Sequence, residues 1–192
     1  NKILDIKVVC NSFLPEWRKN TKYYNSSSAS KQKGGGVVLD LSHELDYFCW
    51  IFGTPNLIYA RLSRRGNLEI DVEDTADIMV ETVQGVVGMV HLNMIQKTKS
   101  RTCEVVGTNG SLTWNGILDE IAGITKQGKK IEITGAKYDG NQMYVDELRY
   151  FLDCVDGLNK HDLNFKREKE VVELILAIKE SASKSIPVKL LR

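Results

Sequence analysis

The chain has 192 residues, of which 42% are hydrophobic and 27% are charged, a balance typical of a globular protein with its own core. The formal net charge is only +1, and no stripe of Lys and Arg interleaved with aromatic residues is present, which argues against a nucleic-acid partner. No apolar run approaches the roughly 20 residues of a membrane-spanning helix, so the sequence predicts no membrane partner.

Four cysteines are spread along the chain without a C-x-x-C pair, so the sequence predicts neither a metal site nor a disulfide framework. They are Cys10, Cys49, Cys103 and Cys154. We expect reduced, mostly buried thiols in a cytoplasmic protein. The chain starts at Asn1 without a Met or a signal-like apolar stretch, and we expect it to begin inside a longer protein.

Residues 3–12 alternate loosely and predict a strand. The polar stretch that follows, residues 13–33, contains aromatic residues, including Trp17 and Tyr24, and the base Arg18. Long ordered loops in compact domains often carry binding residues, so we expect this segment to contact a ligand. A flexible surface segment is the alternative.

Dense apolar residues between Val37 and Phe52 predict a mostly buried helix, entered through residues 34–36 and closed by Gly53. The glycine triplet at 34–36 is not a dinucleotide-binding fingerprint. A polar loop precedes it instead of a strand, and Leu39 occupies the place of the third glycine.

From residue 56 to about residue 134 the chain consists of strand-length runs, many rich in β-branched residues and separated by Gly, Asn or Asp turns. The turns at 83–85 and 108–110 predict hairpins, the second with the favoured Asn-Gly pair. Hairpins imply antiparallel pairing, so one large antiparallel sheet is expected.

Two helical stretches, 141–158 and 167–183, and a short strand at 187–190 complete the pattern. We therefore predict one α+β domain over residues 1–192, with a large, mostly antiparallel sheet and helices packed on one face. The other face is left for solvent or a partner, and we expect the chain to self-associate through it.

The first candidate for chemistry is the set Asp40, His43 and Asp46, which follow one another at three-residue spacing within the predicted helix. Acidic neighbours can tune a histidine for proton exchange near neutral pH. Spacing alone favours the other interpretation, a core histidine held by two carboxylates.

Four bases near predicted loops are candidates for contacts with an acidic or phosphorylated substrate, and solvated side chains are the alternative. They are Arg18, Lys97, Lys99 and Arg101. His91 and Asn93 share one face of an alternating strand, which would look either into a cleft or into a subunit contact.

Residues 34–53, GGGVVLDLSHELDYFCWIFG, resemble the G-G-G-x-x-x-D-x-x-H-x-x-D-x-x-x-W-x-x-G signature of the glucose–fructose oxidoreductase, inositol dehydrogenase and rhizopine-catabolism (Gfo/Idh/MocA) family. Other segments match the family in the same order, namely FLPEW at 13–17, EDTADIMVE at 73–81, GVVGMVHLNM at 85–94, EVVGTNGSLTWN at 104–115 and IPVKL at 186–190. The resemblance covers essentially the whole chain as the family's C-terminal domain.

The resemblance implies an oxidoreductase that uses NAD or NADP, bound mainly by an N-terminal Rossmann domain absent from this chain. That domain carries a lysine in a Glu-Lys-Pro motif, and no cofactor-binding residue is expected here. A sugar, nucleotide sugar or polyol is the implied substrate. His43 matches the family's histidine and Asp46 the acidic residue one turn later. Many members have a further acidic residue four positions before the histidine, whereas Asp40 lies three before it.

On this basis we expect His43 and Asp40 to be catalytic. The expected substrate-binding residues are Asp46, Tyr24, Trp17, Arg18, Asn93 and Arg101. Because fold does not fix function, two alternatives stay open. One is a non-catalytic sugar-binding or oligomerisation module, and the other is a regulatory sugar sensor on the same fold.

Overall fold

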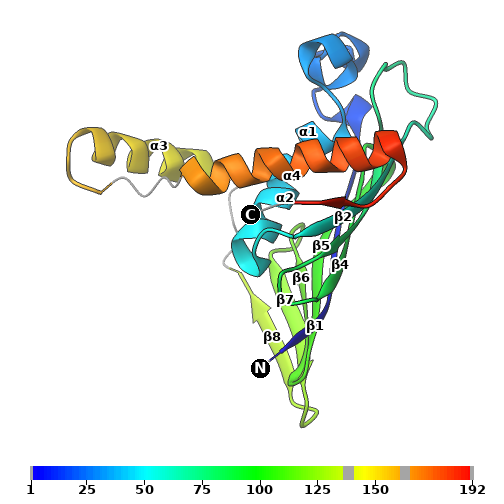
Figure 1. Ribbon diagram of the computed structural model, residues 1–192. Coiled ribbons are helices and arrows are strands. Elements are labelled where there is room, and N and C mark those ends of the chain that lie inside the picture. Colours follow the sequence, from blue (N-terminus) through cyan, green and yellow to red (C-terminus); the bar gives the residue numbers. More distant parts are fainter. Residues whose placement is uncertain (1, 136–140, 161–164, 191–192) are drawn as a thin grey trace.

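A nine-stranded sheet runs through the protein in the order β8-β7-β6-β5-β1-β4-β3-β2-β9 (Figure 1). The computed structural model describes residues 2–135, 141–160 and 165–190. The strands are β1 (Ile3–Phe13), β2 (Leu57–Ser63), β3 (Thr75–Glu81), β4 (Val87–Asn93), β5 (Ile95–Gly107), β6 (Gly110–Asn115), β7 (Glu120–Thr125), β8 (Lys130–Thr134) and β9 (Val188–Lys189). All neighbouring strands are antiparallel except β1 and β4, which run parallel. The predicted α+β class with a large, mostly antiparallel sheet is confirmed.

Both predicted hairpins are present, and a glycine with positive φ sits in each. Gly85, with φ of 74°, lies between β3 and β4, and Gly110, with φ of 137°, begins β6 after β5. Glycine adopts such φ values without the steric cost of a Cβ. The strands β4 and β5 follow one another in the chain but do not pair, because β1 lies between them.

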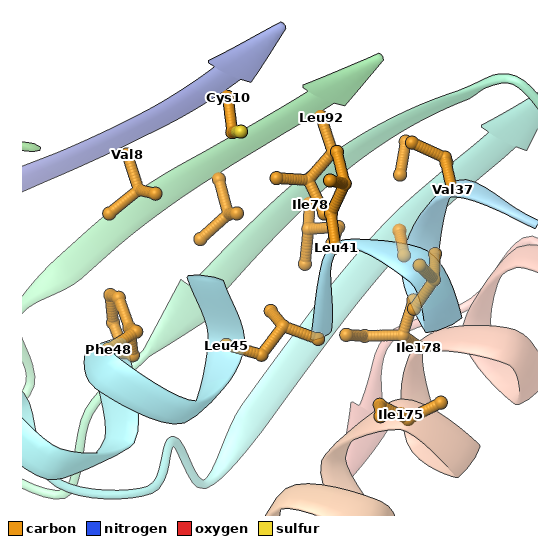
Figure 2. Packing of buried hydrophobic residues seen from close by; sticks show 14 of the residues in the cluster. Val8, Cys10, Val37, Leu41, Leu45, Phe48, Ile78, Leu92, Ile175 and Ile178 are labelled. Carbon is orange, nitrogen blue, oxygen red and sulfur yellow. The ribbon is translucent and has the colours of Figure 1, made fainter. Parts of the chain in front are cut away.

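The helices are α1 (Val37–Asp40), α2 (Ser42–Phe52), α3 (Gln142–Val155) and α4 (Phe165–Lys184), with short 3₁₀ helices η1 (Leu14–Glu16), η2 (Tyr23–Asn25), η3 (Ser27–Ala29) and η4 (Lys31–Lys33). The helices α2 and α4 cover one face of the sheet (Figure 1). Alternate side chains of the central strands, among them Val8, Ile78 and Leu92, pack there against Leu45 and Ile178 (Figure 2). Each of the five is at most 1% exposed, and full burial of such a side chain stabilises the fold by about 1.5–3 kcal/mol.

The predicted single helix between Val37 and Phe52 is wrong in one respect, because the helix breaks at Leu41. This residue has φ of −105° and ψ of 25° and connects α1 to α2. Its side chain is 6% exposed and belongs to the core. The segment is also less buried than expected, since the side chain of Trp50 is 69% exposed near the end of α2.

The two C-terminal helices differ in how they pack. In α4 the residues Val171, Leu174, Ile175 and Ile178 are buried, as predicted. The helix α3 has no buried residue and extends away from the sheet, so its apolar stripe is exposed (Figure 1). None of the helices in the described part combines the length and the apolar character that a membrane span requires.

The second face of the sheet has no helix over it within the described residues. On this face Tyr59, Met79 and Met89 stand side by side, because each is the register partner of the next across β2, β3 and β4. Their exposed fractions are 44%, 53% and 44%. The open face therefore carries an exposed apolar row, formed by Tyr59, Met79 and Met89.

Candidate functional site

An open cleft of about 360 Å³ lies beside the beginning of α2. Its walls come from the end of β1, the segment after η1, the α1–α2 junction and β5. The side chains that line it include Trp17, Asp40, Leu41, His43, Lys99 and Arg101. The cleft thus brings together half of the predicted site residues, and its volume falls within the range of about 300–1,000 Å³ usual for small-molecule sites.

The glycine triplet, residues 34–36, precedes α1, whose last residue, Asp40, lines the cleft. Gly34 and Gly36 have φ of 75° and 118°, backbone values that residues with a side chain rarely adopt. A Cβ on Gly35 would collide with backbone atoms of Ser27 and Ser28, and one on Gly36 would collide with the Glu73 carboxylate. The triplet therefore allows the 3₁₀ segment, which is residues 14–33 with the helices η1 to η4, to pack closely against the start of α1.

The same geometry does not fit a dinucleotide. A phosphate-binding turn connects a strand to a helix and points free backbone N–H groups at an anion. Here the 3₁₀ helix η4 precedes the glycines, the helix that follows has four residues, and a carboxylate already lies against Gly36. The glycine triplet therefore serves close packing and not the binding of a dinucleotide phosphate.

His43 lies on the wall of the cleft with 52% of its side chain exposed, so the expectation that it is buried is wrong. Its Nε2 lies 3.1 Å from Oε1 of Glu44. The predicted contacts of His43 with Asp40 and Asp46 are not found. The break at Leu41 changes the direction of the chain between Asp40 and His43, so three-residue spacing no longer places their side chains on one helix face.

Glu44 is the residue that sequence reasoning missed, and its side chain is 0% exposed. Nε of Arg101, from the neighbouring strand β5, lies 2.7 Å from its Oε1. A buried carboxylate is costly unless it is paired, and Arg101 supplies the pairing charge. One sequence signal was available, because Glu44 falls on the apolar stripe formed by Leu41, Leu45 and Phe48.

Polar groups near Glu44 are kept neutral. Burial, with a contribution from the Glu44 charge, raises the pKa of the Cys10 thiol to about 12. The same two causes raise the pKa of the Tyr47 hydroxyl above its usual range. Glu44 is therefore surrounded by one guanidinium, one imidazole, a thiol and a phenol, and none of these adds a negative charge near neutral pH.

Candidate metal-ligand atoms of Cys10, His43 and Glu44 all lie within 4.8 Å of one another. One feature disfavours a bound metal there. Arg101 already pairs with Oε1 of Glu44, and its charge repels a cation.

Asp40 and Asp46 occupy different environments. In the cleft, Asp40 accepts a hydrogen bond of 2.7 Å from the Ser28 hydroxyl through Oδ1, and its Oδ2 has no hydrogen-bond partner among the described residues. That oxygen is buried, although other atoms of Asp40 line the cleft. Asp46 instead faces α4, where its Oδ1 lies 3.7 Å from Arg167, and it does not line the cleft.

The 3₁₀ segment contributes one of its three predicted residues to the cleft. Trp17 lines it, and its indole N–H donates a hydrogen bond of 3.0 Å to the Ser12 hydroxyl, which fixes the ring at the cleft edge. Tyr24 packs edge-to-face on Tyr23 and, like Arg18, does not line the cleft.

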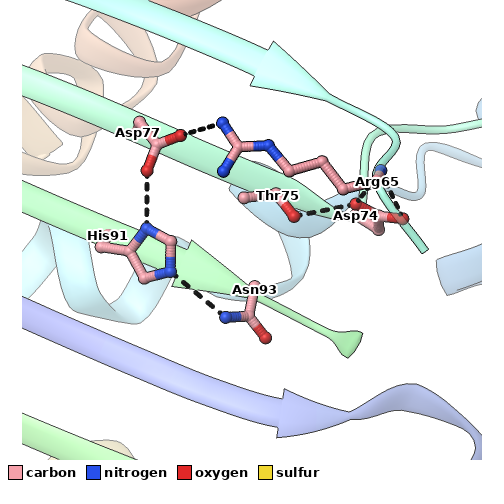
Figure 3. Close-up of polar contacts among 6 residues, drawn as sticks. All are labelled: Arg65, Asp74, Thr75, Asp77, His91 and Asn93. Carbon is pink, nitrogen blue, oxygen red and sulfur yellow. Dashed lines mark hydrogen bonds and ion pairs between the residues drawn. The ribbon is translucent and has the colours of Figure 1, made fainter. Parts of the chain in front are cut away.

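Asn93 lies on the open face of the sheet, opposite the helices and His43. It donates hydrogen bonds to Asn11 and to Nε2 of His91, at 2.8 Å and 3.2 Å. Figure 3 shows the continuation, in which His91 meets Asp77 at 2.7 Å and Asp77 pairs with Arg65. Asn93 therefore belongs to a polar network on the sheet face expected for self-association, and it does not line the cleft that contains His43.

Comparisons with known proteins agree with this architecture. The sequence profile of the GFO/IDH/MocA C-terminal domain matches residues 2–113. Levoglucosan dehydrogenase in complex with NADH is similar over 100% of this chain and 59% of its own, with a TM-score of 0.84 and 18% identity. An NAD binding oxidoreductase from Klebsiella pneumoniae is similar over 100% of this chain and 60% of its own, with a TM-score of 0.81 and 15% identity.

The chain spans less than two thirds of the length of these structures, and at such identities the likeness concerns the fold. Comparison with curated proteins gives no match. The profile match covers more than half of the sequence and includes the glycine triplet, both sides of the cleft and the central strands. The chain belongs to the GFO/IDH/MocA family and contains its C-terminal domain.

Proposed function

We propose that this chain is the substrate-binding part of an NAD- or NADP-dependent oxidoreductase that acts on a sugar, nucleotide sugar or polyol. The observation that carries the proposal is the half-exposed imidazole of His43 on the wall of a cleft that Arg101 also lines, with the buried Glu44 carboxylate beside both side chains. Family membership and the fold shared with levoglucosan dehydrogenase support the substrate class.

The cleft residues suit alcohol oxidation. Oxidation of an alcohol removes a hydride from its carbon, which a nicotinamide accepts, and a proton from its hydroxyl oxygen, which the protein must take up. We assign the proton to His43, whose half-exposed imidazole lines the cleft and belongs to the side-chain type that exchanges protons near neutral pH. Asp40 and Arg101 would hold substrate hydroxyls, and the ring of Trp17 would pack on the apolar face of the sugar.

The cofactor would be bound mainly by an N-terminal domain outside this chain. Two observations support this division. The glycine triplet does not fit a dinucleotide, and the NADH complex of levoglucosan dehydrogenase contains a large part that this chain does not match. Calorimetric titration of the 192-residue chain with NAD and NADP should detect no binding at micromolar concentrations, and micromolar affinity would refute the division.

We further propose that two copies associate through the open sheet face. The exposed row of Tyr59, Met79 and Met89 supports self-association, because a second copy would bury the same row against itself. The four free cysteines agree with the cytoplasm as the proposed location, where thiols stay reduced.

The proposed activity is tested on the complete protein with a panel of neutral sugars, polyols and sugar nucleotides, with nicotinamide absorbance as the readout. Turnover of at least one class, lost on replacing His43, is the expected result. Saturable sugar binding without any turnover would instead identify a non-catalytic binding module. Neither binding nor turnover across the panel would refute the substrate class.

A further inference from the structure

Glu44 has no exposed surface, yet it lies beside two groups that line the cleft. Nε of Arg101 and Nε2 of His43 approach the same oxygen, Oε1, at 2.7 Å and 3.1 Å. Neither Glu44 oxygen has a partner in hydrogen-bond geometry among the described residues, so charge holds the three groups together. The buried carboxylate of Glu44 thus contacts Arg101 and His43, two side chains that line the cleft, without lining it itself.

We propose that Glu44 is a positioning residue that fixes the guanidinium of Arg101 and sets the tautomer of His43. The proposal rests on the assignment of proton transfer to His43. A carboxylate only accepts hydrogen bonds, so a neutral imidazole with Nε2 against Glu44 carries its hydrogen on Nε2. Nδ1 is then the basic nitrogen, and among the described residues it has no hydrogen bond or ion pair.

The other groups around Glu44 leave this role intact. Tyr47 and Cys10 adjoin the carboxylate, but burial raises the pKa of both. The two side chains therefore stay neutral and bring no further charge close to Glu44. Arg101 balances the charge of Glu44, and its guanidinium lies over the Trp114 ring with the central carbon 5.2 Å from the centroid. Arg101 is therefore the charged partner of Glu44.

A purely structural role is less consistent with the position. Glu44 lies on the stripe of Leu41, Leu45 and Phe48, where an apolar residue would pack, and buried ion pairs stabilise a fold no better than well-packed apolar residues. A charge at this place does have a consequence for the cleft, because it orients two of the side chains that line it. The difference between these roles is measurable.

The tautomer is read by ¹⁵N NMR of the 192-residue chain, which has only three histidines. At a pH where the imidazole is neutral, His43 should carry its hydrogen on Nε2. In Glu44→Gln the side-chain amide can donate to Nε2, so the population with the hydrogen on Nδ1 should rise at least several-fold. Glu173→Gln, on the exposed face of α4, is the matched control and should leave His43 unchanged.

Two NMR results would overturn the proposal. One is a wild-type His43 with its hydrogen mainly on Nδ1, a measurement that needs no variant. The other is the same tautomer in wild type and Glu44→Gln. If Glu44→Gln does not fold, Glu44→Gln combined with Arg101→Gln removes both buried charges together, and the same tautomer shift is expected.

Kinetics of the complete enzyme supply a second, independent readout. Glu44→Gln should lower kcat by about 10²-fold or more, as expected where a carboxylate sets the tautomer of a base. In a His43→Asn background the same change should lower kcat less than about threefold, because residues that act through one another are not additive. Equal losses in both backgrounds would overturn the proposal.

The two readouts separate this proposal from the proposed function. If a stable His43→Asn enzyme keeps full turnover, His43 does not take the proton, and the kinetic role of Glu44 fails with it. The NMR experiment still decides whether Glu44 sets the tautomer. If His43→Asn is inactive but Glu44→Gln is fully active, only the positioning role is refuted.

Discussion

Nε of Arg101 lies 2.7 Å from Oε1 of Glu44, and this ion pair joins β5 in the sheet to the helix α2 that covers it. Tyr47, one turn along α2, packs edge-to-face on Trp114 of β6, with ring centroids 5.7 Å apart. Trp114 is the register partner of Cys103 on β5. Charge and aromatic contacts therefore tie the helix α2 to the sheet beside the cleft.

Replacing Arg101 by Met should lower the free energy of unfolding by about 3 kcal/mol, because the buried Glu44 charge loses its partner. The loss is expected at the lower end of the usual range since the Arg101 side chain is 32% exposed. Chemical denaturation measures it. Lys169→Met, which breaks a surface pair with Glu173, should cost about 0.5 kcal/mol or less, and equal losses would contradict the argument.

The sheet was predictable because its signals are local. Alternating residues in runs such as β3 and β4 place one set of side chains on the helices and the other on the open face. Glycine in the turns at 83–85 and 108–110 fixes the hairpins. The insertion of β1 between β4 and β5 was not predictable, since it depends on pairing between distant segments.

The cleft was only partly predictable. The signature placed His43 and Asp40 on its wall, but the break at Leu41 depends on how that side chain enters the core, which spacing does not reveal. The burial of Glu44 was indicated only by its place on the stripe of Leu41, Leu45 and Phe48, which is a weak signal in a segment so rich in apolar residues. The pairing of Glu44 with Arg101 joins residues far apart in sequence, so only the folded chain displays it.

Thiol reactivity should follow burial. Burial, with a smaller contribution from Glu44, raises the pKa of Cys10 to about 12 and that of Cys103 to about 11. At pH 8 their thiolate fractions are then on the order of 10⁻⁴ and 10⁻³, whereas the thiolate is the reacting form. Mass spectrometry after brief iodoacetamide treatment should find the partly exposed Cys154 modified first. Equally fast labelling of Cys10 in the folded chain would contradict this order.

Acid stability should depend on Asp77. Partial burial raises the pKa of its carboxyl, but the hydrogen bond with His91 and the charge of Arg65 outweigh burial and leave the pKa below its usual value. The ionised form therefore stabilises the fold above about pH 4, and this contribution is lost as the pH falls through the lowered pKa.

Asp77→Asn should accordingly lose less free energy of unfolding than wild type between about pH 6 and about pH 3. The difference should stay below about 1 kcal/mol, because the Asp77 side chain is 39% exposed. Urea titrations across this pH range measure it. The exposed Asp5, on the same sheet, is the control position, and an Asp5→Asn variant with the same reduced loss would rule out the specific role of Asp77.

Self-association should depend on the apolar row of the open sheet face. Met89→Lys places a charge beside Met79 and should weaken association at least about tenfold in sedimentation experiments, a loss of about 1.4 kcal/mol. Leu118→Lys, at an apolar residue in the turn after β6 that is more exposed than Met89, should leave association unchanged. A wild-type chain that stays monomeric at high concentration would refute the proposed interface.

Loss of turnover without loss of stability should follow the replacement of His43. In the complete enzyme His43→Asn keeps a polar side chain but removes a base that works near neutral pH, so turnover should fall by roughly 10²–10⁴-fold. His43→Ala should behave alike. Because the side chain is 52% exposed, the free energy of unfolding should change by less than about 0.5 kcal/mol in both variants.

The control is His91→Asn, on the opposite face of the sheet, which should keep turnover close to that of wild type. Cofactor affinity should hardly change in any of the three variants, since the dinucleotide is proposed to bind outside this chain. Steady-state kinetics and thermal unfolding on the same samples separate the possible outcomes. Large destabilisation without a separate loss of turnover would restore a structural role for His43, and near-normal turnover in stable His43→Asn would remove it from proton transfer. A fall in turnover with unchanged unfolding is the result that the half-exposed imidazole beside Glu44 predicts.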